Sequence, residues 1–361
     1  MAKTEPRMDI FDVMVEGNHE RVLISSDPEA GYRGIIAIHD TALGPALGGT
    51  RFWNYDDDRA AVIDALRLSR GMTYKAAITG LKLGGGKSVI WGDNRIENRE
   101  PLFRAHGRAV ESLNGLYITA EDVGTSPEDM QFVALETRHV VGLPGRSGDP
   151  SPVTAFGVYR GIKACAAVEY GDDGLSGRHV AVQGLGHVGY HLCEHLAREG
   201  AKLTVTDIDP QRVRRVVDAF DADAVATEAI YDVDADIFSP CALGAAISDE
   251  TIDRLRVDIV AGAANNQLAR SRTHGPGLHD RGILYAPDYV INAGGLISVY
   301  GELQGWSADQ SKRKAGDIYE ALLHIFDLAK SEGIPPETAA DQVAEARILD
   351  AKNLQRAAHT T

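Results

Sequence analysis

Residues 174–210, GLSGRHVAVQGLGHVGYHLCEHLAREGAKLTVTDIDP, carry the pattern that decides the fold of this 361-residue chain. The apolar run HVAVQ predicts a buried strand, GLGHVG a turn, and HLCEHLAREG a helix that ends at a glycine. KLTVTD predicts the next strand. A strand, a glycine-rich turn, a helix and a second strand in this order are typical of an α/β protein, so we expect a Rossmann-type doubly wound parallel sheet.

The turn at residues 184–189 has the spacing G-x-G-x-x-G. Such glycines permit a tight turn and let the backbone approach a pyrophosphate at the helix N-terminus. Asp207 ends the second strand, where a carboxylate would accept hydrogen bonds from a ribose 2′-OH and repel a 2′-phosphate. The pattern favours NAD over NADP; the alternative is a glycine-rich turn with a solvated aspartate. The cofactor-binding residues predicted here are Gly184, Gly186, His187, Val188, Gly189 and Asp207.

His187, His191 and His195 recur along the following helix at a spacing that could chelate a metal ion. His187 lies inside the glycine turn, however, and no acidic or thiol side chain shares that face in a suitable position. We interpret the three histidines as a solvated helix face and predict no metal site. Cys241, in SPCALG, has no obvious base beside it, so we expect no nucleophilic role.

Composition limits the class of protein and its partners. The chain is 44% hydrophobic and 25% charged, which is ordinary for a soluble globular protein. A formal net charge of −15 argues against nucleic acid or an anionic membrane as a partner. The N-terminus has no apolar core of a signal peptide, and no run approaches the roughly 18 apolar residues of a membrane span. The 3 cysteines are scattered, so we expect a reducing cytoplasm.

The length favours two domains. The segment GLPGRSGDPSP (142–152) is rich in glycine, proline and serine and marks the boundary between them. We therefore expect residues 1–146 to form a substrate-binding and oligomerisation domain and residues 147–306 to form the NAD-binding domain. Helices from about 307 to 361 are expected to pack back onto the first domain, and the two domains are expected to flank a cleft.

In the first domain, residues 21–26 and 33–40 predict strands, whereas LGPALGGTRFW (43–53) has the composition of a glycine-rich connection. Asp57 onward predicts a capped helix. LYITAEDVG (116–124) predicts a strand that ends in acidic residues, and Ser126 with Asp129 predicts a capping box at the start of a helix.

The stretch GMTYKAAITGLKLGGGKSVIWG (71–92) places Lys75 and Lys87 among apolar residues, with Lys87 directly after three glycines. A buried ammonium is unfavourable unless an anion meets it, and a lysine in a dry pocket can lower its pKa and act as a base. We interpret the stretch as a pocket in which one lysine binds an anion and the other moves protons. The alternative is a glycine-rich turn before a strand, with both lysines reaching solvent.

The chain resembles the amino-acid dehydrogenase family of glutamate, leucine, phenylalanine and valine dehydrogenases, and is most similar to the leucine dehydrogenases. The resemblance covers nearly the whole chain. The motifs that carry it are IAIHDTALGPALGGTR, GMTYKAA, LGGGKSVI, YITAEDVG, PSPVTAFGVYRG, VQGLGHVG, DIFSPCALG, GAANNQL and APDYVINAGG.

The resemblance implies roles for individual residues. Lys75 would bind the substrate α-carboxylate beside Gly48 and Gly49. Lys87 would be the general base, its pKa lowered by the nearby charge of Lys75, and Asp122 would meet the substrate amino group and relay a proton. Positions near the nicotinamide are matched by Thr154, Asn266 and Asn292.

The same resemblance implies an apolar substrate, because Leu47 and Val299 stand where glutamate-specific members have a lysine and a hydroxyl-bearing residue. A pocket of Leu47, Ala120, Leu296 and Val299 suits leucine, valine or isoleucine. Leu296 is also similar to phenylalanine-preferring members, so a phenylalanine-preferring enzyme is one alternative. A non-catalytic amino-acid sensor is another. A hydroxy-acid dehydrogenase is disfavoured by the lysine pair. Relatives assemble as homo-oligomers, and the same is expected here.

Overall fold

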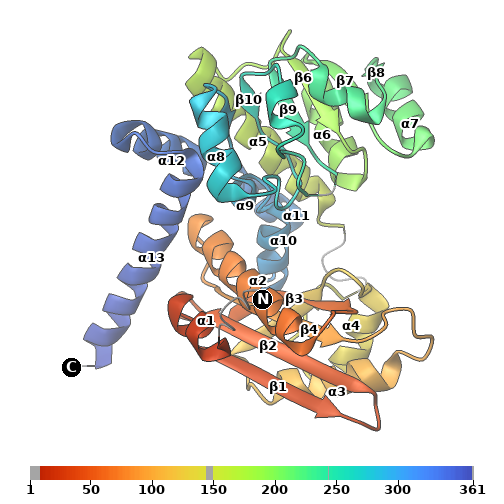
Figure 1. Cartoon of the computed structure of the whole chain (residues 1–361), viewed down its shortest axis with the longest axis vertical. Coiled ribbons are helices and arrows are strands. Elements are labelled where there is room, and N and C mark those ends of the chain that lie inside the picture. Colours follow the sequence, from red (N-terminus) through yellow and green to blue (C-terminus); the bar gives the residue numbers. More distant parts are fainter. Residues whose placement is uncertain (1–8, 144–148, 243, 360–361) are drawn as a thin grey trace, which may run out of the picture. The chain divides into compact units, whose positions relative to one another are not determined.

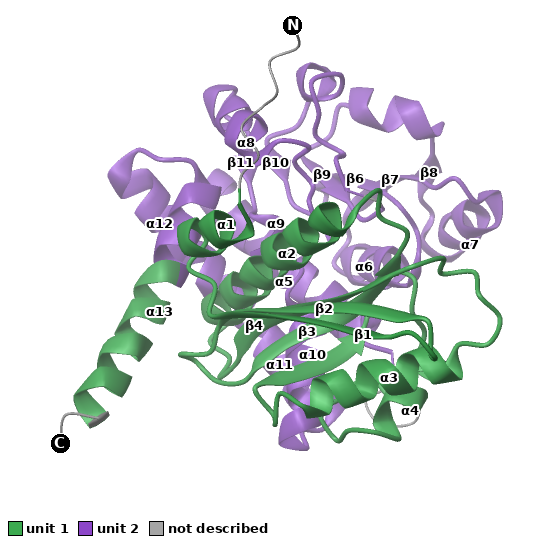
Figure 2. Ribbon diagram, turned by 60° about the horizontal axis from the view of Figure 1, so that its bottom comes forward, with its two compact units in different colours: residues 1–148, 345–361 green, residues 149–344 purple. Residues whose placement is uncertain are grey.

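The computed structural model describes residues 9–143, 149–242 and 244–359. The chain forms two compact units, one of Met1–Gly148 with Glu345–Thr361 and one of Asp149–Ala344, shown in green and purple in Figure 2. We call them unit 1 and unit 2. Both are α/β, as the sequence predicts. None of the helices in the described ranges is long and apolar enough to cross a membrane.

Unit 1 is built on a five-stranded mixed sheet with the order β1-β2-β4-β3-β5. β1 and β2 form an antiparallel hairpin, β2 pairs with β4 antiparallel, and β3 runs parallel to both β4 and β5. The strands are β1 (Arg21–Asp27), β2 (Tyr32–Asp40), β3 (Ala46–Trp53), β4 (Gly84–Trp91) and β5 (Tyr117–Glu121).

Helices cover both faces of this sheet (Figure 1). On one face, side chains of β2 and β4 such as Ile35 and Val89 pack against Val62 and Leu66 of α2. On the other face, residues such as Phe52 pack against α3 and α4. Burial on both faces explains why β2 reads as an almost continuous apolar run. The helices are α1 (Ile10–Glu16), α2 (Asp58–Ile78), α3 (Glu100–Glu111) and α4 (Pro127–Ala134).

Two glycine-rich segments of unit 1 are strands rather than turns. Residues 43–53 were expected to be a connection, but β3 occupies Ala46–Trp53 and pairs on both sides. The glycines before Lys87 also lie inside β4, and none of them has a positive φ angle. A Cβ on Gly85 would lie 2.1 Å from the backbone nitrogen of Thr73 in α2. Glycine is therefore required here for close packing of helix on strand, and not for a turn.

Unit 2 contains a six-stranded sheet with the order β11-β10-β9-β6-β7-β8, in which every pair is parallel. This confirms the predicted Rossmann-type sheet. α8 and the 3₁₀ helix at Thr227–Asp232 pack on one face through Leu278 and Ile230. The strands are β6 (His179–Gln183), β7 (Lys202–Thr206), β8 (Asp223–Ala224), β9 (Ile237–Pro240), β10 (Ile259–Val260) and β11 (Leu284–Tyr285).

The longer helices of unit 2 pack largely on one another. α5 contacts α6, α10, α11 and α12. The helices are α5 (Ser151–Tyr170), α6 (His187–Arg198), α7 (Pro210–Phe220), α8 (Ser271–Asp280), α9 (Asp288–Ile291), α10 (Gly294–Gln304), α11 (Ala308–Gly316) and α12 (Ile318–Glu332).

The C-terminal region divides differently from the expectation that residues 307–361 complete the first domain. Residues up to Ala344 belong to unit 2, because α11 and α12 pack on α5. Glycines on α5 allow this approach, since a Cβ on Gly157 would lie 2.7 Å from the side chain of Ile318. Only the end of α13 (Pro336–His359) belongs to unit 1, where Glu345 accepts a hydrogen bond of 2.5 Å from Tyr74.

Candidate active site

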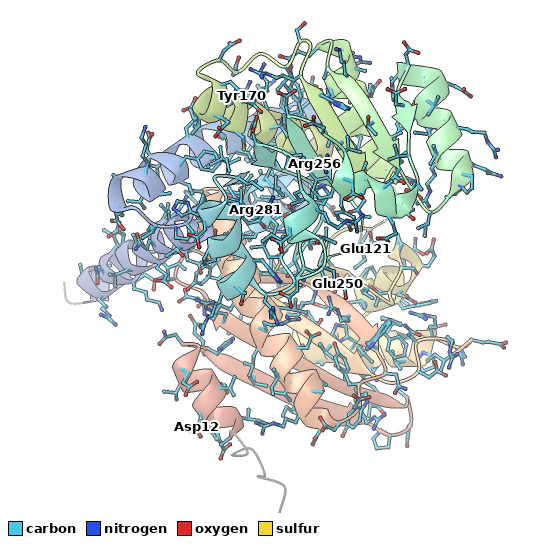
Figure 3. The ribbon with its side chains drawn as sticks, turned by 45° about the horizontal axis from the view of Figure 1, so that its top comes forward. Asp12, Glu121, Tyr170, Glu250, Arg256 and Arg281 are labelled. Carbon is cyan, nitrogen blue, oxygen red and sulfur yellow. The ribbon has the colours of Figure 1, made fainter. Side chains whose placement is uncertain are left out.

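Lys87 lies in the middle of β4 with its side chain only 7% exposed. Its Nζ donates a hydrogen bond of 2.6 Å to Oδ2 of Asp122, which follows β5. Glu121, labelled in Figure 3, is the last residue of β5 and directly precedes this carboxylate. The lysine is thus buried against an anion, and the alternative of a solvent-exposed Lys87 is wrong.

Arg51 of β3 is a third member of this site that sequence reasoning missed. Its Nε donates to Asp122 Oδ2 at 3.2 Å, and its Nη1 donates to Asp64 Oδ2 at 2.8 Å. Tyr55 donates to the same Asp64 oxygen at 2.6 Å. A signal was present in the sequence, since Gly49 and Arg51 share one face once residues 46–53 are read as a strand.

Burial and charge act in opposite directions on this pair. Burial lowers the pKa of Lys87 below its ordinary value, although the adjacent Asp122 carboxylate opposes the shift. Burial alone would raise the pKa of Asp122, but the charges of Lys87 and Arg51 outweigh it and hold that pKa below its usual range. Arg51 is a cation that helps to lower the pKa of Lys87.

Gly48, Gly49 and Lys75 lie on elements that adjoin Lys87. Both glycines are in β3, between β4 and β5. A Cβ on Gly49 would lie 2.8 Å from the Cβ of Asp122, so the backbone of β3 directly adjoins that carboxylate's residue. Lys75 is half-buried in the last turn of α2, which packs on β4. Unit 1 therefore carries Lys87, Asp122, Gly48 and Gly49 on three neighbouring strands or directly after them, and Lys75 on the helix that packs against β4.

The four predicted pocket residues are divided between the units. Leu47 in β3 and Ala120 in β5 are buried in unit 1, and Ala120 pairs with Gly49. Leu296 is buried and Val299 half-buried on α10 of unit 2, about one helical turn apart. Leu47 and Ala120 therefore belong to unit 1, and Leu296 and Val299 belong to unit 2.

The glycine turn of unit 2 connects β6 to α6. Gly184 has a φ of +97°, which few other residues adopt, and a Cβ there would lie 2.7 Å from the nitrogen of Ala242. A Cβ on Gly189 would lie 2.0 Å from the carbonyl oxygen of Gly184. Gly186 caps the helix, and the space around its Cβ position is open. The start of α6 is thus open at the Cβ position of Gly186 among the described residues.

Asp207 follows β7 and is bonded to this turn. Its Oδ2 accepts a hydrogen bond of 2.6 Å from the backbone N–H of Leu185, and its Oδ1 accepts one of 2.8 Å from Asp209. The turn and the carboxylate are therefore held in fixed relation. Of the other predicted turn residues, Val188 is half-buried, and His187 is exposed and pairs with Asp149 at 3.2 Å.

The three predicted nicotinamide-end residues differ in environment. Asn292 is buried, and its Nδ2 donates a hydrogen bond of 2.8 Å to Asn265 Oδ1, whereas its own buried Oδ1 has no hydrogen-bond partner among the described residues. Thr154 of α5 donates to the carbonyl of Pro150, and Asn266 is exposed with a φ of +50°. A buried carbonyl oxygen without a partner is unfavourable unless a ligand donates to it. The unpartnered oxygen and the glycine turn fit a dinucleotide that carries a carboxamide.

The remaining sequence candidates have ordinary structural roles. His191 lies 3.3 Å from Glu194, and His195 stacks on Tyr159. Over the described ranges no group of three or more His, Cys, Asp or Glu side chains is placed to hold a metal ion. All three cysteines are free, and burial raises the pKa of Cys241, which disfavours the nucleophilic thiolate.

Comparison with known proteins identifies the family. Residues 19–139 match the family described as Glu/Leu/Phe/Val dehydrogenase, dimerisation domain, and residues 204–356 match Glutamate/Leucine/Phenylalanine/Valine dehydrogenase. The leucine dehydrogenase of Thermoactinomyces intermedius is 56% identical over 344 residues, which cover 94% of each chain. The valine dehydrogenase of Streptomyces albus is 50% identical over 93% of this chain and 94% of its own.

Solved structures agree with the sequence comparison. The crystal structure of L-tryptophan dehydrogenase from Nostoc punctiforme superposes with a TM-score of 0.88 at 46% identity, and the match covers 95% of this chain and 99% of that one. Matches of this length include both units together with the lysine stretch and the glycine turn. The chain therefore belongs to the glutamate, leucine, phenylalanine and valine dehydrogenase family of amino-acid dehydrogenases.

Proposed function

We propose that this chain catalyses the NAD-dependent oxidative deamination of branched-chain L-amino acids (leucine, valine and isoleucine) to 2-oxo acids and ammonia, and the reverse reductive amination. The observation that carries the proposal is the buried pair of Lys87 Nζ and Asp122 Oδ2, 2.6 Å apart. A lysine buried against a carboxylate holds or releases a proton at a defined position. Oxidation of an amino acid through an imine needs two such proton transfers.

The overall reaction converts an amino acid, water and NAD⁺ into a 2-oxo acid, ammonium, NADH and a proton. Lys75 would bind the α-carboxylate of the substrate, with Gly48 and Gly49 lining the same region. Asp122 would accept a proton from the amino group as the C–N bond becomes a C=N bond. Neutral Lys87 would then take a proton from water as the water oxygen bonds to the imino carbon, and the reverse direction returns that proton.

NAD, when bound, supplies the acceptor for the hydride that leaves the substrate Cα. The open helix N-terminus at Gly186 would hold the pyrophosphate. Asp207 would bind the ribose 2′-OH, and Asn292 Oδ1 would accept a hydrogen bond from the carboxamide. The residues proposed to contact the cofactor are Gly184, Gly186, His187, Val188, Gly189, Asp207, Thr154, Asn266 and Asn292.

The preference for branched-chain substrates is supported by Leu47, Ala120, Leu296 and Val299, since none of these side chains can pair with a second carboxylate. Glutamate should therefore be a poor substrate. A second candidate is an enzyme that prefers aromatic amino acids. Leu296 and the likeness to L-tryptophan dehydrogenase support it, and an apolar pocket discriminates between such substrates by only about 1–3 kcal/mol.

The test is to follow NADH formation with leucine, valine, isoleucine, phenylalanine, tryptophan and glutamate, each with NAD and with NADP. Highest kcat/KM for the branched-chain set with NAD supports the proposal. Preference for phenylalanine or tryptophan selects the aromatic alternative. Turnover of none of them contradicts the dehydrogenase proposal and favours an amino-acid sensor.

We also propose that the chain assembles with copies of itself. The family match over residues 19–139 is described as a dimerisation domain, and it covers most of unit 1. One structural relative is described as a hetero-hexameric glutamate dehydrogenase. Light scattering on the purified protein tests this, and a mass near that of one chain, 38.8 kDa, contradicts it.

A further inference from the structure

Arg51, Asp64 and Tyr55 form a second set of contacts directly beside the Lys87–Asp122 pair, and the proposed function gives them no role. Arg51 is the link between the two sets. Its Nε and its Nη1 donate to different carboxylates, Asp122 at 3.2 Å and Asp64 at 2.8 Å. The guanidinium therefore bridges β3, the end of β5 and α2.

One oxygen of Asp122 receives both cations. Lys87 Nζ and Arg51 Nε both donate to Oδ2, at 2.6 and 3.2 Å. The Asp122 side chain is 26% exposed, whereas that of Lys87 is 7% exposed. Arg51 thus fixes the orientation of the carboxylate while part of it remains accessible to a substrate.

Asp64 in turn fixes Arg51. Its side chain is 13% exposed, and it accepts hydrogen bonds from Tyr55 at 2.6 Å and, through Oδ1, from Arg67 at 3.1 Å. Burial tends to raise the pKa of Asp64, but the hydrogen bond from Tyr55 and the charge of Arg51 hold it below its ordinary value. Asp64 is therefore an anion at neutral pH, and it offsets part of the positive charge that Arg51 presents.

We propose that Arg51 and Asp64 are positioning residues for the reaction: Arg51 orients the Asp122 carboxylate and adds positive charge beside Lys87, and Asp64 holds Arg51 in place and moderates that charge. This inference rests on the proposed function, in which Lys87 is a base and Asp122 a proton relay. A purely structural brace between β3 and α2 is the competing explanation. The two differ in what they predict for the titration of Lys87.

The two substitutions should move this titration in opposite directions. Arg51→Met removes a positive charge near Lys87. The protonated form of Lys87 is then more stable, so its pKa rises. Asp64→Asn removes a negative charge, so that Asp122 is the one carboxylate still paired with Arg51. The positive charge near Lys87 is then less offset, and the pKa of Lys87 falls. The other charged groups and the histidine on elements packed against β4 stay unchanged in both variants; they are Asp58, Arg59, Arg67, Arg70 and Lys75 on α2, Arg33, His39 and Asp40 on β2, and Glu121 on β5.

The experiment measures kcat/KM for oxidative deamination against pH in the wild type, Arg51→Met, Arg51→Lys and Asp64→Asn. Because neutral Lys87 is the active form, the rate rises with pH through the apparent pKa of the Lys87–Asp122 pair. We expect the apparent pKa of this rise to increase by about one unit in Arg51→Met and to decrease by about one unit in Asp64→Asn. Arg51→Lys keeps the positive charge, so its apparent pKa should equal that of the wild type. Its kcat should stay below that of the wild type.

Matched controls come from the exposed pair of Arg95 and Asp93 in the same unit. Arg95→Met and Asp93→Asn remove the same charges from side chains that are 86% and 55% exposed, where solvent screens them, and should leave the pH profile unchanged. Thermal unfolding of every variant reports the loss of stability that a structural brace would cause.

A second readout does not depend on turnover. Lysine labelled with ¹³C at Cε is titrated by NMR in the same variants, and the Lys87 signal is assigned by its absence in Lys87→Met. Opposite shifts together with turnover support the inference; opposite shifts without oxidation of any amino acid show that Arg51 and Asp64 set the charge around Lys87 and contradict the proposed function. Equal shifts, or shifts no larger than those of the Arg95 and Asp93 controls, overturn the inference and leave the proposed function intact.

Discussion

The two candidate binding regions are built on different physical principles. In unit 1 the functional groups are charged side chains that are buried and paired with one another, as in Lys87, Asp122 and Arg51. In unit 2 the turn at Gly184–Gly189 presents backbone at a helix N-terminus, with few side chains over it. Proton transfer benefits from charges held away from water, whereas a pyrophosphate needs N–H groups that a ligand can reach.

Glycine serves a different purpose in each region. Gly85 in β4 has an ordinary strand conformation and is required because α2 packs against it. Gly184 has a positive φ and is required by the backbone conformation of the turn itself. The same residue type therefore indicates tight packing in one region and a special turn in the other.

The most severe way to test unit 1 is Lys87→Ala, which removes the proposed base and leaves Asp122 beside Arg51 alone. Loss of a general base typically lowers kcat by about 10²–10⁴-fold. NAD affinity should remain that of the wild type, because the glycine turn belongs to unit 2. Steady-state kinetics with leucine and calorimetric titration with NAD measure the two effects.

The control for that variant is Lys82→Ala, since Lys82 is exposed and lies just before β4. It should behave as the wild type. Retention of leucine binding without turnover in the wild type itself would instead indicate a sensor. Full activity in Lys87→Ala would contradict the assignment of the base.

The glycine turn of unit 2 is tested by comparing Gly186→Ala with Gly189→Ala. A Cβ on Gly186 meets open space in the protein, so the variant should fold normally but obstruct the pyrophosphate and weaken NAD binding by about 10–100-fold. A Cβ on Gly189 would meet the Gly184 carbonyl at 2.0 Å, so that variant should lose thermal stability as well.

Titration calorimetry with NAD and thermal denaturation separate these two outcomes. Gly71→Ala is the control, because that position in α2 is also open and belongs to unit 1. Unchanged NAD affinity in Gly186→Ala would place the pyrophosphate elsewhere.

Unit 1 also contains a buried cluster of polar side chains, which affects the stability of the fold. Thr50 Oγ1 is hydrogen-bonded to Ser88 Oγ at 2.7 Å, to Thr119 Oγ1 at 2.6 Å and to His106 Nε2 at 2.8 Å. His106 is fully buried, and burial lowers its pKa from 6.5 to about 3. This imidazole is therefore neutral in the folded protein at neutral pH.

The pH dependence of stability follows from that lowered pKa. Below about pH 6.5 the unfolded chain binds a proton at His106 that the folded chain does not, so stability is lost as the pH falls toward 3. Between about pH 6.5 and pH 5 this group alone should remove about 2 kcal/mol. His106→Gln has no imidazole at this position, so its unfolding free energy lacks this pH dependence. The difference in unfolding free energy between the wild type and His106→Gln should therefore be smaller at about pH 5 than at about pH 6.5 by that amount.

Chemical denaturation at the two pH values measures the difference. His39 and His195, whose pKa values are both lowered to about 4, contribute equally to wild type and variant and therefore cancel. His279→Gln, at an exposed position, is the control. A difference that does not change with pH would mean that His106 is already protonated in the fold.

Sequence patterns with a local cause were predicted well. The βα turn, the parallel sheet of unit 2 and the capping box of Ser126 and Asp129 all follow from nearby residues, and the structure contains each of them. The sequence also predicts a pocket in which Lys87 moves protons, and the structure buries Lys87 against Asp122.

What was missed depends on contacts between distant segments. β3 was read as a connection because its two glycines suppress the strand signal, although pairing with β4 and β5 outweighs their weak propensity. Without β3 as a strand, the sequence does not show that Arg51 lies on the same face of the sheet as Lys87. The packing of α11 and α12 on α5 is equally non-local, so sequence patterns alone do not show that residues up to Ala344 belong to unit 2.

The smallest expected effect concerns Asp207. At this residue unit 2 is most similar to the site in unit 1, because in both a carboxylate accepts hydrogen bonds from N–H donors. Asp207→Asn keeps an acceptor for Leu185 N–H but removes the charge. Binding of NAD should weaken by about tenfold, since charge assistance to one hydrogen bond is lost, and discrimination against NADP should fall with it. The ratio of kcat/KM for the two cofactors measures this, with Asp223→Asn on exposed β8 as the control. If the ratio does not change, Asp207 acts only on the turn through Leu185, and cofactor choice must come from neighbours such as Arg212, whose Nη1 lies 3.9 Å from the carboxylate.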